Sequence, residues 1–288
     1  MILLVVLMII ASLSAVVTET AQNSFFYQQY VDKMVRQEQV MALSDGVAEG
    51  VKILFSRDDS NVDYYGEYWS YPVPFSLHGI SVNIEIEDEE RFLNPNILVK
   101  HGVVDEKAKA IFDRLFEITE TGAEFTDKLI EWITPSDVDD GLKHAPFDTT
   151  EEIKLIGGVT PEIFNGRIEG GEFKPGLRSL LSVWSDGKVN INTASKWVLM
   201  ALDSDIDETV ASKIISYREE KPFKKVDDLI NVNGITSDII YRIKPFTDVN
   251  SKHFLVKSDI GIGDVDYTLF ILFVRSGGTV REVWRKIR

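Results

Sequence analysis

The chain contains no cysteine, and this absence excludes a whole class of chemistry. No disulfide, thiolate nucleophile or cysteine-bound zinc site can form, although a cysteine-free chain is compatible with either side of a membrane. No Gly-x-Ser-x-Gly motif and no phosphate-binding loop occurs. The four histidines are scattered without metal-ligand spacing: His78, His101, His144 and His253. We therefore expect this chain to have no enzymatic activity.

Positive charge is scarce, especially at the start of the chain. Lysine and arginine number 31 against 46 aspartate and glutamate residues, which gives a formal charge of −15. Such acidity repels polyphosphates and argues against a nucleic-acid partner, because non-specific binding to nucleic acid depends on cationic contacts. No lysine or arginine precedes Lys33, so the start lacks the basic region of a cleavable secretory signal.

Residues 1–17 contain no charge, proline or glycine. Sequestering such a run from water stabilises by about 1.5–3 kcal/mol per large apolar side chain, so it must lie in lipid or against other helices. At 1.5 Å per residue it spans about 26 Å, slightly less than the roughly 20 residues of an ordinary transmembrane anchor. The alternatives are a cleavable signal, an ordinary anchor, and a pilin-type helix that first spans the membrane and then packs inside a fibre.

The following residues favour the pilin-type helix. No proline occurs between Met1 and Leu54, and the first glycine is Gly46. Residues 18–55 are rich in helix formers, and apolar side chains recur at helical spacing. We predict one continuous helix of about 50 residues, roughly 75–80 Å long. The alternative is a signal anchor joined to a separate core helix.

Strand patterns flank a long helical block. Residues 57–74 are polar and aromatic and indicate a loop, whereas 78–87 alternate between apolar and polar side chains and predict a strand. A Gly277-Gly278 hairpin turn lies within the C-terminal region. That region contains three predicted strands, at 254–256, 267–274 and 279–284. We expect the four strands to form one antiparallel sheet, with the helical block inserted between the first and the second.

The helical block repeats itself. Residues 146–164 align without a gap on 222–240. Each copy predicts a short helix, a glycine turn and a second helix capped by Thr160 or Thr236. Residues 190–194 join the two halves and are expected to supply the N-cap of a helix at 195–202.

Residues 190–249 resemble the helix-hairpin-helix modules of DNA-binding proteins, notably competence-type DNA receptors. Those modules bind phosphate through the backbone amides of a Gly-x-Gly hairpin. The equivalent turn here carries Asp203, Asp205 and Asp207, and three carboxylates disfavour an approaching anion. We interpret the hairpins as a scaffold. A membrane-anchored DNA receptor is the alternative function, and a signal-anchored periplasmic hydrolase is the third.

The order of motifs along the whole chain resembles general secretion pathway protein K, the K-class minor pseudopilin of type II secretion systems. The motifs are residues 1–17, 88–94, 129–133, 146–160, 188–194 and the final strands. The resemblance implies an α+β, pilin-like fold, in which a long N-terminal helix packs on a small antiparallel sheet. It also implies a large inserted α-helical domain that contains two helix-hairpin-helix-like repeats. The implied division is a transmembrane and assembly helix at 1–24, a pilin-like domain at 25–98 and 250–288, and the insertion at 99–249.

The resemblance further implies a non-enzymatic subunit of the pseudopilus. Such a subunit caps or initiates the tip with the I- and J-class minor pseudopilins, joins the major pseudopilin, and supports protein export across the outer membrane. It crosses the inner membrane once, with its soluble domain in the periplasm. The family is made with a short basic leader ending in glycine, so we expect this chain to be the processed form or to have a late start. Mass spectrometry of the membrane-extracted protein would give its true N-terminus and any methylation.

Most pilin-type subunits carry a glutamate at the fifth mature position, where it meets the N-terminal amine of a neighbour. If this chain begins at its mature end, the fifth residue is Val5 and the first carboxylate is Glu19. A subunit without this acid is expected to have no neighbour on that side; the alternative is that Val5 is one more lipid-facing residue. The expected assembly residues are Met1, Val5, Phe25, Phe26, Tyr30 and Met34.

Asp137, Asp139 and Asp140, followed by Gly141, form the first metal candidate. Alternating carboxylates in a glycine-terminated loop can converge on calcium at about 2.3–2.6 Å. The resemblance adds that K-class proteins bind calcium in the helical domain, although the usual Asp-Trp-hydrophobic-Asp-x-Asp is here replaced by a run that begins at Glu131. The alternative is a solvated acidic turn. A second candidate comprises Asp203, Asp205 and Asp207, and no other cofactor is expected.

Overall fold

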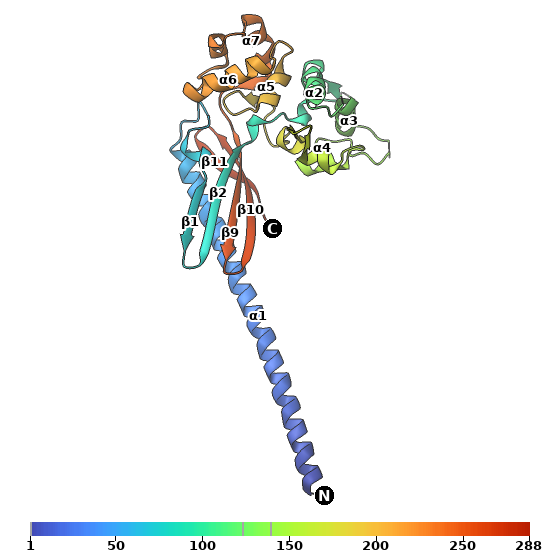
Figure 1. The fold of residues 1–288 in the computed structure, drawn as a ribbon, viewed down its shortest axis with the longest axis vertical. Helices are drawn as coiled ribbons and strands as arrows, with labels where there is room; N and C mark the ends of the chain where they lie inside the picture. The colour runs from blue at the N-terminus through green and yellow to red at the C-terminus, as the bar shows by residue number, and fades with distance from the viewer. Residues whose placement is uncertain (1, 123, 139) are drawn as a thin grey trace.

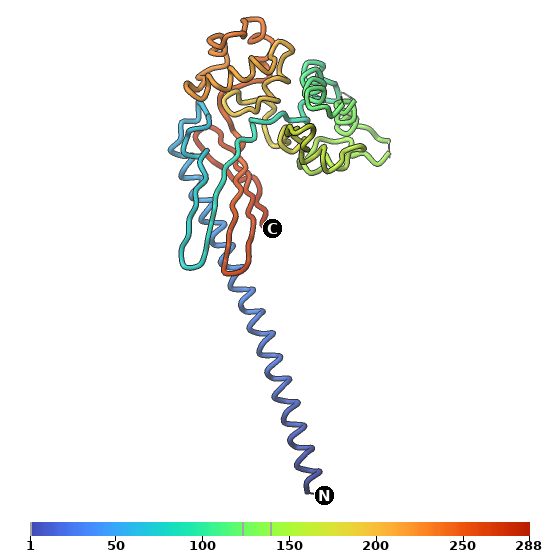
Figure 2. The backbone as a smooth tube through the Cα atoms, in the orientation of Figure 1, coloured from blue at the N-terminus to red at the C-terminus, as the bar shows by residue number. Residues whose placement is uncertain are grey.

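The computed structural model describes residues 2–122, 124–138 and 140–288. One helix, α1 (Ile2–Ser56), has 55 residues and runs without a break from the apolar start into the pilin-like domain. Its N-terminal half projects away from the rest of the molecule (Figures 1 and 2). The predicted continuous helix is therefore confirmed, and the alternative of an anchor joined to a separate core helix is wrong.

The C-terminal part of α1 packs on a five-stranded antiparallel sheet with the order β1-β2-β9-β10-β11. The strands are β1 (Val73–Leu77), β2 (Ile80–Asp88), β9 (His253–Ile262), β10 (Val265–Ser276) and β11 (Thr279–Ile287). Pairing of β2 with β9 joins the chain before the insertion to the chain after it. The predicted antiparallel sheet with an inserted domain is thus confirmed.

The prediction missed β1, because residues 57–74 were expected to form a loop. All five residues of β1 are exposed, so the strand shows no buried alternation. Pro74 removes one backbone donor, which an edge strand tolerates. The turn between β1 and β2 consists of His78 and Gly79, with φ of 50° and 79°, as a two-residue type I′ hairpin requires.

The helix and the sheet share one apolar core. The buried residues of α1 recur every one or two helical turns, because the helix repeats every 3.6 residues. They face residues that alternate along each strand, because a strand repeats every 2 residues. The buried members on α1 are Val40, Val47, Ala48, Val51 and Phe55. They meet Phe254, Val256, Ile260, Leu269, Ile271 and Phe273 of the sheet.

The insertion lies between β2 and β9, at the end of the molecule opposite the N-terminus (Figure 1). Its helices are α2 (Glu106–Ile118), α3 (Glu124–Ile133), α4 (Pro161–Asn165), α5 (Lys196–Leu202), α6 (Glu208–Glu220) and α7 (Ser237–Ile243). Three short strand pairs, which the sequence did not predict, accompany them. They are β3 (Val99–Lys100) with β4 (Val103–Val104), β5 (Gly166–Glu169) with β6 (Glu172–Pro175), and β7 (Val189–Asn190) with β8 (Thr247–Asp248).

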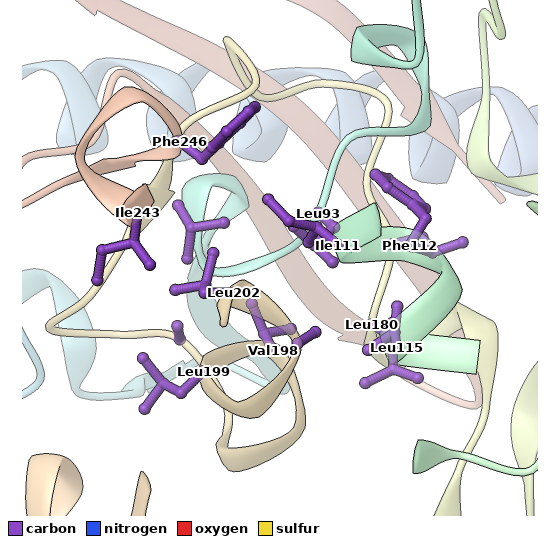
Figure 3. Packing of buried hydrophobic residues seen from close by; sticks show 14 of the residues in the cluster. Leu93, Ile111, Phe112, Leu115, Leu180, Val198, Leu199, Leu202, Ile243 and Phe246 are labelled. Carbon is purple, nitrogen blue, oxygen red and sulfur yellow. The ribbon is translucent and has the colours of Figure 1, made fainter. Parts of the chain in front are cut away.

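The two halves of the insertion share a single core. Figure 3 shows Ile111, Phe112 and Leu115 of α2 near Val198 and Leu202 of α5, and all five belong to one buried cluster. The helix expected at 195–202 begins at Lys196. Its N-cap is Ser195 itself, whose hydroxyl accepts a hydrogen bond from the Val198 amide, rather than a residue of 190–194.

Both copies of the internal repeat adopt the predicted structure. Short 3-10 helices, Thr150–Leu155 and Val226–Asn231, are followed by a glycine turn and then by α4 or α7. The hydroxyls of Thr160 and Thr236 cap these helices, each at 3.3 Å from its amide donor.

The structural repeat extends further than the repeated sequence. The Asn96 side chain accepts from the Phe147 amide at 2.8 Å and donates to its carbonyl at 3.0 Å. Asn192 makes the same pair of hydrogen bonds to Phe223, at 2.9 and 3.0 Å. Each phenylalanine ring also stacks on an aromatic neighbour. The insertion therefore consists of two helical hairpins closed by equivalent asparagine side chains.

Candidate functional site

The projecting part of α1 is the largest exposed apolar feature among the described residues. Every residue from Ile2 to Gln39 is exposed apart from the half-buried Arg36. This part is about 55–60 Å long at 1.5 Å per residue. An 18-residue window of the helix has a mean hydropathy of 2.5, and none of that window is buried in the protein. By length and composition this helix can cross a membrane, a property that it shares with signal sequences.

The predicted assembly residues lie on this projecting part, except Met1, which lies outside the described residues. Val5 is 50% exposed, and the other four are also exposed, namely Phe25, Phe26, Tyr30 and Met34. The Phe25 and Phe26 rings are 6.1 Å apart in an edge-on arrangement. The hydroxyls of Thr18 and Thr20 donate to helix carbonyls at 2.8 Å, so these polar groups are satisfied without water. The apolar surface is therefore suited to lipid or to neighbouring helices.

The first metal candidate lies in the loop between α3 and Pro146. Asp137 is exposed, Asp140 belongs to the same loop, and Asp139 lies outside the described residues. Asp140 Oδ1 accepts from the Leu142 amide at 3.0 Å and lies 2.9 Å from His144 Nε2. The other ring nitrogen of His144 lies 2.9 Å from the Thr134 carbonyl. The two ends of the loop are thus held together by one imidazole.

Both partners of His144 are acceptors, so the charged imidazolium, with two N–H groups, suits this site best. Hydrogen bonding to the Thr134 carbonyl and then to Asp140 raises the pKa of His144. The Leu142 amide and His144 lower the pKa of Asp140. A cationic side chain on the Asp140 oxygen competes with a metal ion for that ligand. In this arrangement the Asp140 oxygen is therefore not free to bind calcium, and calcium binding here stays a prediction.

The three carboxylates of the second metal candidate are engaged in hydrogen bonds within the protein. Asp203 is bound by Arg242 through two hydrogen bonds of 2.6 and 2.8 Å, and Asp205 accepts from the same guanidinium at 2.6 Å. Burial acts to raise the pKa of Asp203, but the hydrogen bonds from Arg242 and from the Asp205 amide, together with the charge of Arg242, lower it overall. Asp207 caps α6 by accepting from the Val210 amide. These carboxylates thus hold the hairpin together, and Arg242 neutralises part of the charge that was expected to repel phosphate.

A cluster of one buried and two half-buried carboxylates, which the sequence did not indicate, lies at the junction of the sheet and the insertion. Ligand oxygens of Asp58, Asp63 and Glu67 lie within 4.8 Å of one another, a spacing that a metal could use. However, Arg275 occupies this position: its Nη1 donates to Asp58 at 2.7 Å and its Nη2 donates to both oxygens of Asp63. Since Arg275 and Asp63 are both buried, the cluster functions as an ion pair rather than as an open metal site.

The junction continues through three acids in a row, Asp88, Glu89 and Glu90, all buried. Asp88 accepts from the Thr193 hydroxyl and the Asn190 amide, at 2.5 and 3.2 Å. Glu90 binds the backbone and the ring of His253. These contacts connect the chain that enters the insertion, at Asp88 and Glu90, to Asn190 and Thr193 within the insertion and to His253 at the start of β9. The inserted domain is thereby fixed on the sheet.

Burial raises the pKa of the Glu89 carboxyl to about 8, and its hydrogen bond from Ser182 opposes this shift. Three consecutive acids normally indicate a solvent-exposed turn. The only local signal against that interpretation is their position directly after a strand with one buried face. Their partners Ser182, Thr193 and His253 lie 93, 105 and 163 residues away in the sequence, which no local pattern reveals.

A comparison with protein families matches residues 185–247 to the helix-hairpin-helix motif family. The match covers α5, α6 and α7, which is less than half of the chain. A search of curated proteins gives no match to the sequence.

A comparison with solved structures matches the crystal structure of the GspK-GspI-GspJ complex from the enterotoxigenic Escherichia coli type 2 secretion system. The TM-score is 0.68 at 16% sequence identity, and the match covers 91% of this chain and 99% of the other. At this identity the comparison concerns the fold, and it extends over the helix, the sheet and the insertion together. The chain therefore has the fold of GspK in that complex, with a helix-hairpin-helix motif inside its inserted domain.

Proposed function

We propose that this protein is a minor pseudopilin of a type II secretion system, and that it acts as a structural subunit without enzymatic activity. The observation that carries the proposal is the combination of the projecting apolar half of α1 with a fold shared over 91% of the chain with GspK. The solved relative lies in a complex with GspI and GspJ, which supports I- and J-class minor pseudopilins as partners here. The major pseudopilin is proposed as a further neighbour along the fibre.

In this proposal residues 1–24 anchor the protein in the inner membrane, and the sheet and the insertion lie in the periplasm. On assembly the helix exchanges lipid for the apolar sides of neighbouring helices. Phe25, Phe26, Tyr30 and Met34 then continue the contact beyond the membrane, because all four are large exposed side chains on the projecting part of α1.

A position at the fibre tip follows from two features. The insertion forms the end of the molecule opposite the N-terminus, where its bulk obstructs a further subunit (Figure 1). If the chain begins at its mature end, its fifth residue is Val5, which offers no carboxylate to a neighbouring N-terminal amine. The protein thus caps or initiates the pseudopilus and thereby supports export of folded proteins across the outer membrane.

The test is co-purification of the full-length chain with I- and J-class minor pseudopilins from detergent-solubilised membranes. A Phe26→Asp/Tyr30→Asp variant should lose the partners, since it places charge in the helix contact. Tyr241→Asp on α7 is the control, because Tyr241 is 82% exposed but far from α1. The proposal fails if wild-type protein recovers neither partner, or if both variants recover them equally.

A membrane-anchored DNA receptor is the second candidate, favoured by the helix-hairpin-helix match at residues 185–247. The formal charge of −15 opposes it, as do Asp203 and Asp205 at the hairpin turn. We expect no shift of duplex DNA by the full-length chain near about 0.1 M salt. Salt-dependent binding that is lost in Arg242→Glu would favour the receptor instead.

A further inference from the structure

A groove of about 1150 Å³ separates the outer face of the sheet from the underside of the insertion. Leu255, Phe270 and Trp284 line it from β9, β10 and β11. Their sequence neighbours Phe254, Val256, Leu269 and Ile271 point into the core with α1. Because side chains alternate along a strand, the groove lies on the face opposite α1. Packing of α1 against other helices therefore leaves it open.

The floor of the groove is apolar and partly uncovered. Trp184, from the insertion, lies on Trp284 with ring centroids 5.3 Å apart. Both indoles are half-buried, as are Leu255 and Phe270. Aromatic pairs of this kind provide a rigid surface with little conformational entropy to lose on binding. The floor can therefore receive a large apolar side chain.

Among the described residues, the exposed side chains that line the groove without an ion-pair partner include more cations than acids. Of the lining acids, Glu87, Asp148 and Glu151 each have a cationic partner, namely Arg91, Lys143 and Lys154. Glu89 is buried, and the exposed Glu85 is the one lining acid among the described residues that has neither burial nor an ion pair. In contrast, Arg178 on the insertion and Lys286 on β11 are exposed and form no ion pair with a described acid. This local excess stands out in a chain with a formal charge of −15.

We propose that this groove binds an extended acidic protein segment whose apolar side chain packs on Trp184 and Trp284, while its carboxylates meet Arg178 and Lys286. Charge complementarity of this kind selects partners and raises the rate of association. A nucleic acid fits less well, because its phosphates are spaced regularly along the whole strand, whereas Arg178 and Lys286 are single cations on the insertion and on β11 beside an apolar floor. The inference goes beyond the proposed function and does not depend on it.

The test measures binding of a synthetic peptide of glutamates around one central phenylalanine to the full-length chain in detergent. Quenching or a wavelength shift of tryptophan fluorescence reports the contact with Trp184 and Trp284. We expect saturable binding that weakens as salt is added. The Arg178→Glu/Lys286→Glu variant should bind at least about tenfold more weakly. Lys213→Glu/Lys221→Glu is the matched control, because both lysines lie outside the groove and carry the same charge. It should bind like the wild type.

Thermal melting of each variant shows that it is folded before binding is measured. A peptide with lysine in place of glutamate and a single-stranded oligonucleotide of equal length complete the set. The proposal is overturned if the acidic peptide does not bind, or if the basic peptide or the oligonucleotide binds as tightly. It is also overturned if the groove variant binds the acidic peptide like the matched control.

Discussion

Arg275 on β10 forms a buried two-oxygen ion pair with Asp63, in the segment that follows α1. The same Asp63 carboxylate accepts from the Ser251 amide at 2.7 Å, just before β9 begins. Through this pair the segment after α1 is connected to β10 and to the residues just before β9.

Removing Arg275 should destabilise the protein strongly. An Arg275→Met variant leaves the Asp63 carboxylate buried without its partner, which typically costs about 3–5 kcal/mol of unfolding free energy. Denaturant unfolding of the full-length chain in detergent measures the loss. The Arg275→Met/Asp63→Asn double variant should recover part of it, because the unpaired charge is gone. A loss below about 1 kcal/mol, the value of an exposed pair, would contradict the structural role of this ion pair.

Glu89 makes the stability of the protein depend on pH. Burial raises its pKa from the usual 4.5 to about 8, so the folded state keeps a proton that the unfolded state releases. The free energy of unfolding should therefore fall as the pH rises between about 4.5 and 8. Glu89→Gln keeps the site neutral and should be more stable at pH 8 by a few kcal/mol, with a smaller pH dependence. Glu85→Gln, on an exposed residue of the preceding strand β2, is the control; equal pH profiles for both variants would contradict this assignment.

The long helix and the sheet could be predicted from local patterns. The absence of proline and early glycine, with apolar spacing of 3.6, is sufficient for α1, and alternation is sufficient for β2. Because β1 has no buried face, it has no such pattern and was missed. The order of predicted strands and helices along the chain also predicted that the insertion lies between β2 and β9, as it does.

The contacts that close the insertion could not be predicted from the repeat. Asn96 precedes its phenylalanine by 51 residues, whereas Asn192 precedes its own by 31. The extra residues of the first copy include the loop between α3 and Pro146, so a constant offset cannot align the two asparagines. Likewise, the burial of Asp88 and Glu89 depends on distant partners rather than on their own polar sequence.

Calcium binding by the acidic loop is open to a direct test. The sequence predicts that about 1 mM calcium raises the melting temperature. Asp137→Asn/Asp140→Asn should abolish this rise. His144→Ala should enlarge it, because Asp140 then loses the imidazole that lies 2.9 Å from its oxygen. Melting temperatures that are equal with calcium and with a chelator would exclude a calcium site here.

Val5 gives the proposed tip position a testable consequence. A Val5→Glu variant supplies the carboxylate that Val5 lacks, so the subunit should become able to lie inside the fibre instead of only ending it. Immunogold labelling of sheared pseudopili locates the subunit, and Val5→Leu serves as the control. If Val5→Glu labels only the tip and supports export like the wild type, Val5 has no role in tip position.

The central claim is that the projecting helix stays on the protein and packs against helices of other pilin-type subunits. The most direct measurement places a photo-reactive amino acid at Phe26, which is 64% exposed, and irradiates intact cells. The account predicts full-length cross-linked products with other pilin-type subunits, and none from the same group placed at the exposed Ser81 on the outer face of β2. Recovery of a chain that lacks the projecting helix, as a free monomer without cross-links, would contradict it.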